Sequence, residues 1–170
     1  SWKFGSKAAQ LRSLSKLGLP IPNGFFISKD VVNEAVSASV FKISNKFRSL
    51  EGLYALRASP SDRDWGSIDP ILNLGMNAAY AKKLAVKVGN VTALEVYRRF
   101  INNFSTAVFG LEIEIFEHSY HKKMRLRNVE YERPLDEGTL SSIVELLKSK
   151  FKQEVGRDFP ESFAEQFDSA

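Results

Sequence analysis

The residue best suited to chemistry near the start of this sequence is Lys7. It lies in the run Gly5-Ser6-Lys7-Ala8-Ala9, which we expect to open a helix. The first amides of a helix lack intrahelical partners, and the positive end of the helix dipole lies there, so an adjacent lysine can help to bind a phosphate. The spacing from glycine to lysine excludes a Walker P-loop. Taken alone, the run is better explained as an ordinary surface lysine in a first helical turn.

A second candidate is Arg57, which directly follows the apolar run 53–56. An arginine at the end of a buried strand can fork onto a phosphate or a carboxylate. A structural salt bridge explains the same placement equally well. The loop that follows, 59–69, contains Gly66 and the acids Asp62, Asp64 and Asp69. These acids could bind magnesium, but capping of turns is the simpler interpretation.

The two histidines, His118 and His121, are three residues apart in a segment with helical spacing. With Glu114 and Glu117 nearby, this geometry can bind zinc or iron. The neighbouring lysines and arginines would repel a cation, so an exposed helix face is the better interpretation. The run 118–127 could also contact nucleic acid, but acids on both sides of it favour a solvated surface of mixed charge.

Composition sets the outer limits. The chain has 170 residues, of which 44% are hydrophobic and 26% charged, and it contains no cysteine. It can therefore form a folded core, but no disulfide and no thiolate metal site. Its net charge of +4 lies in residues 1–77, which hold ten Lys/Arg against six Asp/Glu. This basic excess suits a phosphate-bearing small ligand.

The first part of the chain mixes helices and strands. The spacing of apolar residues predicts a helix that is capped by Ser6 and ended by Gly18, with inward positions at Ala8, Leu11, Leu14 and Leu17. A short strand is expected at 25–27, and Ser28 is expected to cap a second helix. A further strand is expected at 53–56 and a strand or a turn at 71–74, with a loop between them.

From Ala78 onward the pattern is helical. We expect helices over 80–88, 92–108, 113–124 and 140–151, with glycines ending three of them. Capping boxes are expected at Thr92 with Glu95 and at Ser162 with Glu165.

The predicted fold class is α+β. Residues 1–77 form an α/β unit with a small mixed sheet, and residues 78–170 form a helical subdomain. We expect a piece of a longer protein, because a helix opens at Ser162 only eight residues before the printed sequence ends. The sequence shows neither a signal-peptide pattern nor the apolar run of roughly 18–20 residues that a membrane span requires. We therefore expect the protein to be located in the cytoplasm or in the lumen of an organelle.

The order of motifs resembles the pyruvate, phosphate dikinases and the related phosphoenolpyruvate synthases. Residues 5–11 resemble the family's GGKGANL, residues 17–25 its LGLPVPPGF, residues 56–59 its VRSG, and residues 69–77 its DTVLNLGLND. Counterparts in the helical half are residues 97–101, 116–118 and 156–160. The resemblance covers essentially the whole chain, and it favours the dikinase over the synthase.

This resemblance implies the N-terminal part of an ATP-grasp nucleotide-binding domain. In the family, this domain uses ATP and magnesium to phosphorylate a histidine on a swivelling domain of the same chain, and pyruvate becomes phosphoenolpyruvate. The resemblance implies that Lys7 and Arg57 bind the ATP phosphates, and that Gly66 and Asp69 belong to a loop over them. It places the Mg²⁺ ligands outside this chain and implies a homodimeric full-length enzyme.

Two further basic residues, Arg98 and Arg99, lie where the family has basic residues that could dock the phosphohistidine domain. They could equally form surface salt bridges. Neither a nucleic acid nor a membrane is an expected partner.

The sequence also departs from the family pattern. Ser6 and Ala8 replace two of the glycines around the lysine, and residues 63–70 replace the family's SMPGMMDT loop without its methionines and threonine. Asp62 and Asp64 add negative charge, which weakens polyphosphate binding by repulsion. Two hypotheses follow. The chain is the ATP-binding part of a dikinase, inactive in isolation, or it is a catalytically degenerate relative that serves as a binding or regulatory module.

Overall fold

The computed structural model describes residues 4–28, 30–31, 52–59, 70–126 and 135–170. The chain divides into two compact units: unit 1 is Ser1–Ser49 with Arg57–Pro70, and unit 2 is Leu50–Leu56 with Ile71–Ala170. Helices together with a small sheet confirm the α+β class. The domain boundary expected after Asn77 stays a prediction.

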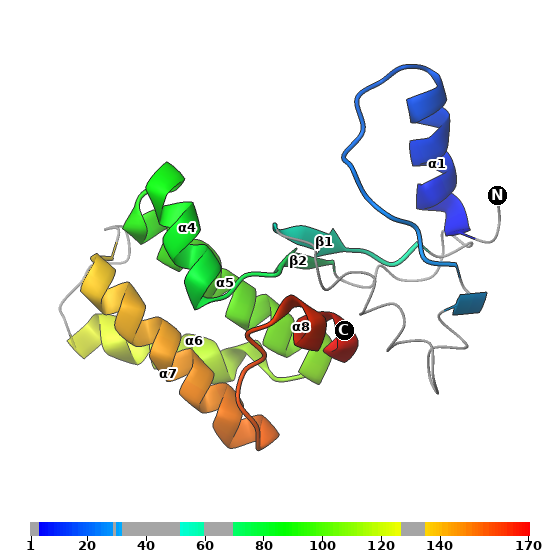
Figure 1. Ribbon diagram of the computed structural model, residues 1–170. Coiled ribbons are helices and arrows are strands. Elements are labelled where there is room, and N and C mark those ends of the chain that lie inside the picture. Colours follow the sequence, from blue (N-terminus) through cyan, green and yellow to red (C-terminus); the bar gives the residue numbers. More distant parts are fainter. Residues whose placement is uncertain (1–3, 29, 32–51, 60–69, 127–134) are drawn as a thin grey trace. The chain divides into compact units, whose positions relative to one another are not determined.

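Unit 1 contains helix α1 (Gly5–Lys16), which confirms the first predicted helix (Figure 1). The prediction that Ser6 caps it is wrong. The helix begins at Gly5, so the N-cap position is occupied by Phe4, two residues before Ser6, and the N-cap side chain makes no capping hydrogen bond. At the other end Gly18 has a φ of 73° and its amide donates to the Ser15 carbonyl at 3.0 Å, so the predicted glycine stop is confirmed.

Two other predictions for unit 1 need correction. Of the apolar positions of α1, Ala8 is buried, but Leu14 and Leu17 are 40% and 75% exposed. Residues 25–27 form no strand, since no described strand pairs with them, and the Phe26 ring instead lies 6.3 Å from that of Phe4. The expected cap at Ser28 is confirmed, because its Oγ accepts from the Val31 amide at 3.4 Å. The rest of that predicted helix lies outside the described residues.

Unit 2 begins with a two-stranded antiparallel sheet of β1 (Tyr54–Leu56) and β2 (Ile71–Leu74). Tyr54 pairs with Leu74 and Leu56 with Ile71, with an irregularity between the two pairs. The strand predicted at 53–56 is confirmed by β1, and residues 71–74, predicted as a strand or a turn, form the strand β2.

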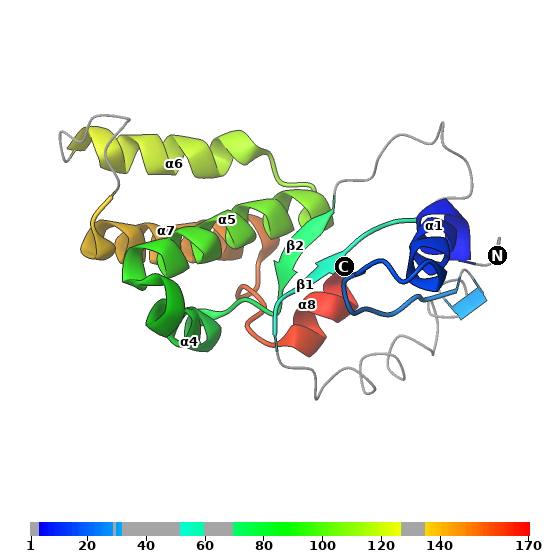
Figure 2. The same ribbon diagram turned by 90° about the horizontal axis from the view of Figure 1, so that it is seen from above.

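Five helices complete the described part of unit 2: α4 (Ala78–Val88), α5 (Asn90–Phe109), α6 (Ile113–Leu126), α7 (Glu137–Val155) and α8 (Phe163–Ser169). Helix α5 contacts α4, α7 and β2, while α6 packs on α7. Figure 2 shows α5, α6 and α7 running side by side. Gly110 and Gly156 end α5 and α7 in the left-handed conformation, as predicted.

The two predicted capping boxes had different outcomes. Ser162 and Glu165 form the box at the start of α8, as expected. The box at Thr92 and Glu95 is wrong, because α5 begins earlier, at Asn90, and this leaves Glu95 in the second turn.

The core of unit 2 is rich in phenylalanine. The Phe159 ring meets those of Phe100, Phe104 and Phe151 edge-on, at centroid distances of 5.9, 5.7 and 5.1 Å. Such edge-to-face contacts stabilise a core beyond the burial of apolar area. They join α5 and α7 to the segment that leads into α8.

Candidate functional site

Lys7 lies exposed in the first turn of α1, and its segment approaches the backbone of residue 59 very closely. A Cβ atom added at Gly5 would lie 1.6 Å from the Ser59 carbonyl oxygen and 2.6 Å from its Oγ. Gly5 also has a φ of 75°. Only glycine fits this position, for reasons of both space and conformation.

The side chain of Ser59 completes this contact. Its Oγ accepts a hydrogen bond from the Ala8 amide at 3.3 Å, across 51 residues of sequence. An amide in the first turns of α1 thus finds its partner on a distant segment. The contact joins the segment of Lys7 to the segment of Arg57.

Arg57 directly follows β1, as predicted, and it is exposed. It belongs to unit 1, as do Lys7, Gly5 and Ser59. The structure therefore brings the backbones around the two predicted cations together. The other predicted site residues, Gly66 and Asp69, lie outside the described residues. Sequence reasoning missed Ser59, whose only signal was its place in the VRSG-like motif.

Arg98 forms local contacts in unit 2. Its guanidinium binds both carboxylate oxygens of Glu95, at 2.9 and 2.6 Å, and lies 4.6 Å from the centre of the Tyr120 ring on α6. These contacts make Arg98 a structural link between α5 and α6. Arg99 also binds Glu95, at 3.0 Å, but its side chain is 72% exposed.

The two arginines set the charge state of Glu95. Partial burial by itself would raise the pKa of this carboxyl, but the hydrogen bonds and charges of Arg98 and Arg99 outweigh it and hold the pKa below its ordinary value. The same bond to Glu95 raises the pKa of Arg98. The salt-bridge alternative noted from the sequence thus accounts for the contacts of Arg98.

The LNLG motif, residues 72–75, ends in a tight turn whose role is structural. Gly75 has a φ of 99°, and a Cβ there would lie 2.5 Å from the Gly52 carbonyl oxygen. The buried side chain of Gln166 holds this turn: its Oε1 accepts from the Gly75 amide at 2.7 Å, and its Nε2 donates to the carbonyls of Met76 and Pro160. Sequence reasoning missed Gln166, because two of its three partners, Gly75 and Met76, lie 91 and 90 residues away.

Glu161 is a second connection point in unit 2. Its carboxylate accepts from the Tyr97 hydroxyl at 2.8 Å and from Lys148 at 2.7 Å, and its carbonyl accepts from the Asn77 side chain. Burial and the bond to Glu161 raise the pKa of Tyr97 well above its ordinary value. These contacts tie α4, α5 and α7 to the segment before α8.

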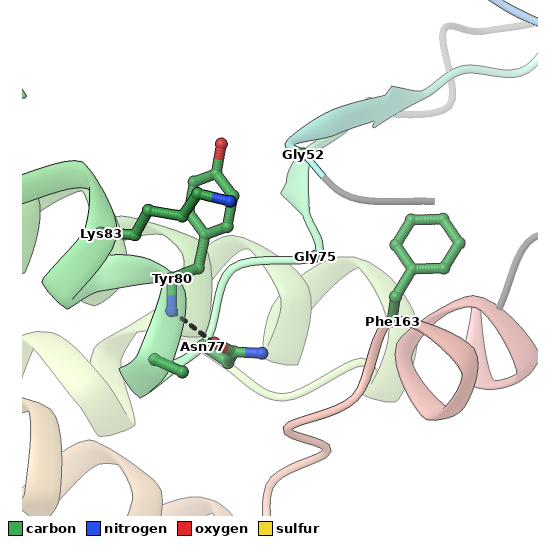
Figure 3. A pocket seen from close by; sticks show the side chains of 7 residues that line it. Gly52, Gly75, Asn77, Tyr80, Lys83 and Phe163 are labelled. Atoms are coloured by element: carbon green, nitrogen blue, oxygen red, sulfur yellow. Dashed lines mark hydrogen bonds between the residues drawn. The ribbon is translucent and has the colours of Figure 1, made fainter. Parts of the chain in front are cut away.

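A cavity of about 250 Å³ lies in unit 2, lined by Gly52, Gly75, Asn77, Ala79, Tyr80, Lys83 and Phe163. Figure 3 shows Tyr80 and Lys83 of α4 on one side and Phe163 on the other, with the two glycines between them. Two of the first amides of α4 have side-chain partners, because Asn77 accepts from the Tyr80 amide and Glu161 accepts from the Ala78 amide. Of the site residues predicted from the sequence that the structure describes, none lines this cavity.

Metal binding finds no support in the described part of the chain, where no group of three or more His, Asp or Glu side chains could hold an ion. His118 is exposed, and the His121 ring packs against Tyr120. The described residues therefore offer no set of ligands that fits the magnesium implied by the resemblance. Among the same residues, no helix has the length and apolar character needed to cross a membrane.

Comparison with known proteins finds relatives among the pyruvate, phosphate dikinases. The chain is 28% identical over 177 residues to the chloroplastic pyruvate, phosphate dikinase of Mesembryanthemum crystallinum, covering 92% of this chain and 19% of that protein. It is 32% identical over 141 residues to the enzyme of Rickettsia typhi, covering 70% and 16%. It is 28% identical over 189 residues to that of Giardia intestinalis, covering 98% and 21%. No protein-family model matches the chain.

The chain is related to phosphotransferases of the kinase type. Its relatives are pyruvate, phosphate dikinases, so the resemblance drawn from the motifs is confirmed. The chain spans about a fifth of the length of the curated relatives that it matches.

Proposed function

We propose that this chain is the N-terminal, ATP-binding part of a pyruvate, phosphate dikinase, with a partial ATP-grasp fold. Similarity over 98% of the chain to a dikinase supports the family. The observation that carries the site is the contact between Gly5 and Ser59, which joins the first turn of α1 to the segment of Arg57. Two cations on touching backbones suit one polyphosphate.

Within this proposal, Lys7 and Arg57 neutralise the ATP phosphates while a phosphoryl group leaves. Phosphoryl transfer depends mainly on alignment and charge compensation, and these two cations supply part of both. Gly66 and Asp69 belong to the loop over the phosphates. Magnesium supplies further charge compensation when bound, through ligands outside this chain.

The full-length enzyme would interconvert ATP, phosphate and pyruvate with AMP, pyrophosphate and phosphoenolpyruvate, through a phosphohistidine on another domain of the same chain. The isolated chain would catalyse nothing. Of the two candidate docking arginines, Arg99 is better placed to meet that domain, since Arg98 is committed to Glu95 and Tyr120. The full-length enzyme would be a homodimer located in the cytoplasm or in the lumen of an organelle.

The alternative is a degenerate relative that binds or regulates without catalysis. The specific observation in its favour is the replacement of two motif glycines around Lys7 by Ser6 and Ala8. Side chains at these positions narrow the space beside the first turn of α1.

The test is phosphoenzyme formation from labelled ATP in the longer protein that carries this chain. We expect Lys7→Ala and Arg57→Ala each to slow label transfer by about a hundredfold, because each removes a charge from the phosphate site. Lys16→Ala is the matched control, since Lys16 is an exposed lysine in the last turn of the same helix. It should transfer label at the wild-type rate.

Undiminished transfer in both Lys7→Ala and Arg57→Ala would show that these residues do not bind the phosphates. Failure of the wild-type protein to form any phosphoenzyme, while it still binds ATP, would favour the degenerate alternative.

A further inference from the structure

The contact between Gly5 and Ser59 is closer than the simple crossing of two segments requires. With a Cβ position at 1.6 Å from the Ser59 carbonyl oxygen and 2.6 Å from its carbonyl carbon, the helix and the segment touch backbone to backbone. Backbone atoms cannot rotate away as a flexible side chain can. The separation between these segments therefore depends on the absence of a side chain at residue 5.

The contact is also fixed in register. The Ala8 amide donates to the Ser59 Oγ at 3.3 Å, on the same first turns of α1 that carry Lys7. One contact restricts the distance between the segments, and the hydrogen bond restricts how far one can slide along the other. Lys7 and Arg57 each lie two residues from a member of this contact.

We propose that Gly5 and Ser59 are positioning residues, whose contact fixes Arg57 relative to Lys7 so that both cations reach one polyphosphate. This inference rests on the proposed function. Neither residue needs to touch the nucleotide. A displacement of about 1 Å in a binding group can lower rates by about a hundredfold, so the contact can control binding through geometry alone.

Gly18 provides a matched control. Gly5 and Gly18 lie near opposite ends of α1 with φ values of 75° and 73°. An alanine at either position incurs the same left-handed strain. At Gly18 an added Cβ meets no atom within 4 Å, whereas at Gly5 it meets the Ser59 backbone. The difference between the two variants therefore isolates the contact.

The experiment measures ATP binding by titration calorimetry in the longer protein, below the onset of thermal unfolding. We expect Gly5→Ala to bind ATP at least about tenfold more weakly than Gly18→Ala. A second readout is the effect of Arg57→Ala in each background. It should weaken binding about tenfold in the Gly18→Ala protein and less than about twofold in the Gly5→Ala protein, where Arg57 is already displaced.

The positioning role would be overturned if Gly5→Ala and Gly18→Ala bound ATP with equal affinity while Arg57→Ala still weakened ATP binding in the wild type. That result would leave the proposed function intact. The positioning role would also be overturned if Arg57→Ala weakened ATP binding as much in the Gly5→Ala protein as in the Gly18→Ala protein. If neither Lys7→Ala nor Arg57→Ala weakens binding in the wild type, the proposed function fails and the inference fails with it.

Should Gly5→Ala fail to fold, Ser59→Ala decides the question. This substitution removes only the acceptor of the Ala8 amide and introduces no clash. We expect Ser59→Ala to bind ATP about two- to fivefold more weakly than the wild type. Adding Arg57→Ala should weaken ATP binding less in this variant than in the wild type. Wild-type affinity in Ser59→Ala would overturn the inference.

Discussion

Gln166 shows how much one buried polar side chain can hold in this protein. Its amide makes three hydrogen bonds, to the Gly75 amide and to the carbonyls of Met76 and Pro160, and the residue is fully buried. A buried backbone group that loses its partner keeps its full desolvation penalty. The turn after β2 therefore depends on a residue near the end of the printed sequence.

Replacing Gln166 with leucine should lower the free energy of unfolding by about 3 kcal/mol, because three buried groups lose a partner at once. Urea denaturation followed by circular dichroism measures this. Gln153→Leu, on the exposed face of α7, is the control and should change stability by less than about 0.5 kcal/mol. Equal effects of the two substitutions would contradict the role given to Gln166.

Individual residues were predictable from sequence only where their role is local. Gly18, Gly110 and Gly156 were identified as helix ends, since a glycine after a periodic run is a local signal. Ser59 and Gln166 were not, because the partner of Ser59 lies 51 residues away and two of the three partners of Gln166 lie 90 and 91 residues away. Lys7 and Arg57 were selected by residue type, but the contact between their segments is visible only in the structure.

At the scale of elements, Asp136 is the N-cap residue of α7. Its Oδ1 accepts from the Thr139 amide at 2.8 Å and its Oδ2 from the Thr139 hydroxyl at 2.6 Å. Asp136→Ala should lower the free energy of unfolding by about 1 kcal/mol, because α7 loses its cap. Thermal unfolding checks this, with Asp136→Ser as the conservative variant that keeps an acceptor. Loss of the same stability in both variants would argue against capping.

The link between α5 and α6 should be sensitive to acid. Glu95 has a pKa in the folded protein below the ordinary 4.5, owing to the bonds from Arg98 and Arg99 that outweigh burial. A lowered folded pKa stabilises the folded state above the unfolded pKa, and this contribution disappears as the pH falls through the folded value. We therefore expect stability to fall below about pH 4.5. Urea denaturation should show a smaller fall for Glu95→Gln, and an identical fall would exclude Glu95 as a cause.

Helices and strands could be predicted from the sequence where the spacing of apolar residues within one segment was enough to identify them. The helices of unit 2 and the strand at 53–56 were predicted, because apolar spacing decides them locally. The strand at 25–27 was not correct, since a strand requires a partner and β-propensity alone does not supply one. The start of α5 was also misjudged: the Thr92 and Glu95 pattern fits a cap, but Glu95 instead pairs with the two arginines one turn onward.

At the scale of the whole molecule, the described residues of the two units differ in how far their apolar side chains are buried. Unit 2 has a dense aromatic core, whereas in unit 1 Leu17, Leu19, Phe25 and Phe26 are each more than half exposed. The proposed phosphate site belongs to unit 1. Among the described residues of unit 1, the contact between α1 and the Ser59 segment links the segments that carry the two cations.

The central claim is that Lys7 and Arg57 bind the same polyphosphate. The most direct measurement is the affinity of the longer protein for ATP and for adenosine, in wild type, Lys7→Ala, Arg57→Ala and the double variant. We predict that each substitution weakens ATP binding at least about tenfold, leaves adenosine binding unchanged, and interacts with the other, so that the effects are not additive. Independent effects, or equal losses for ATP and adenosine, would contradict the claim.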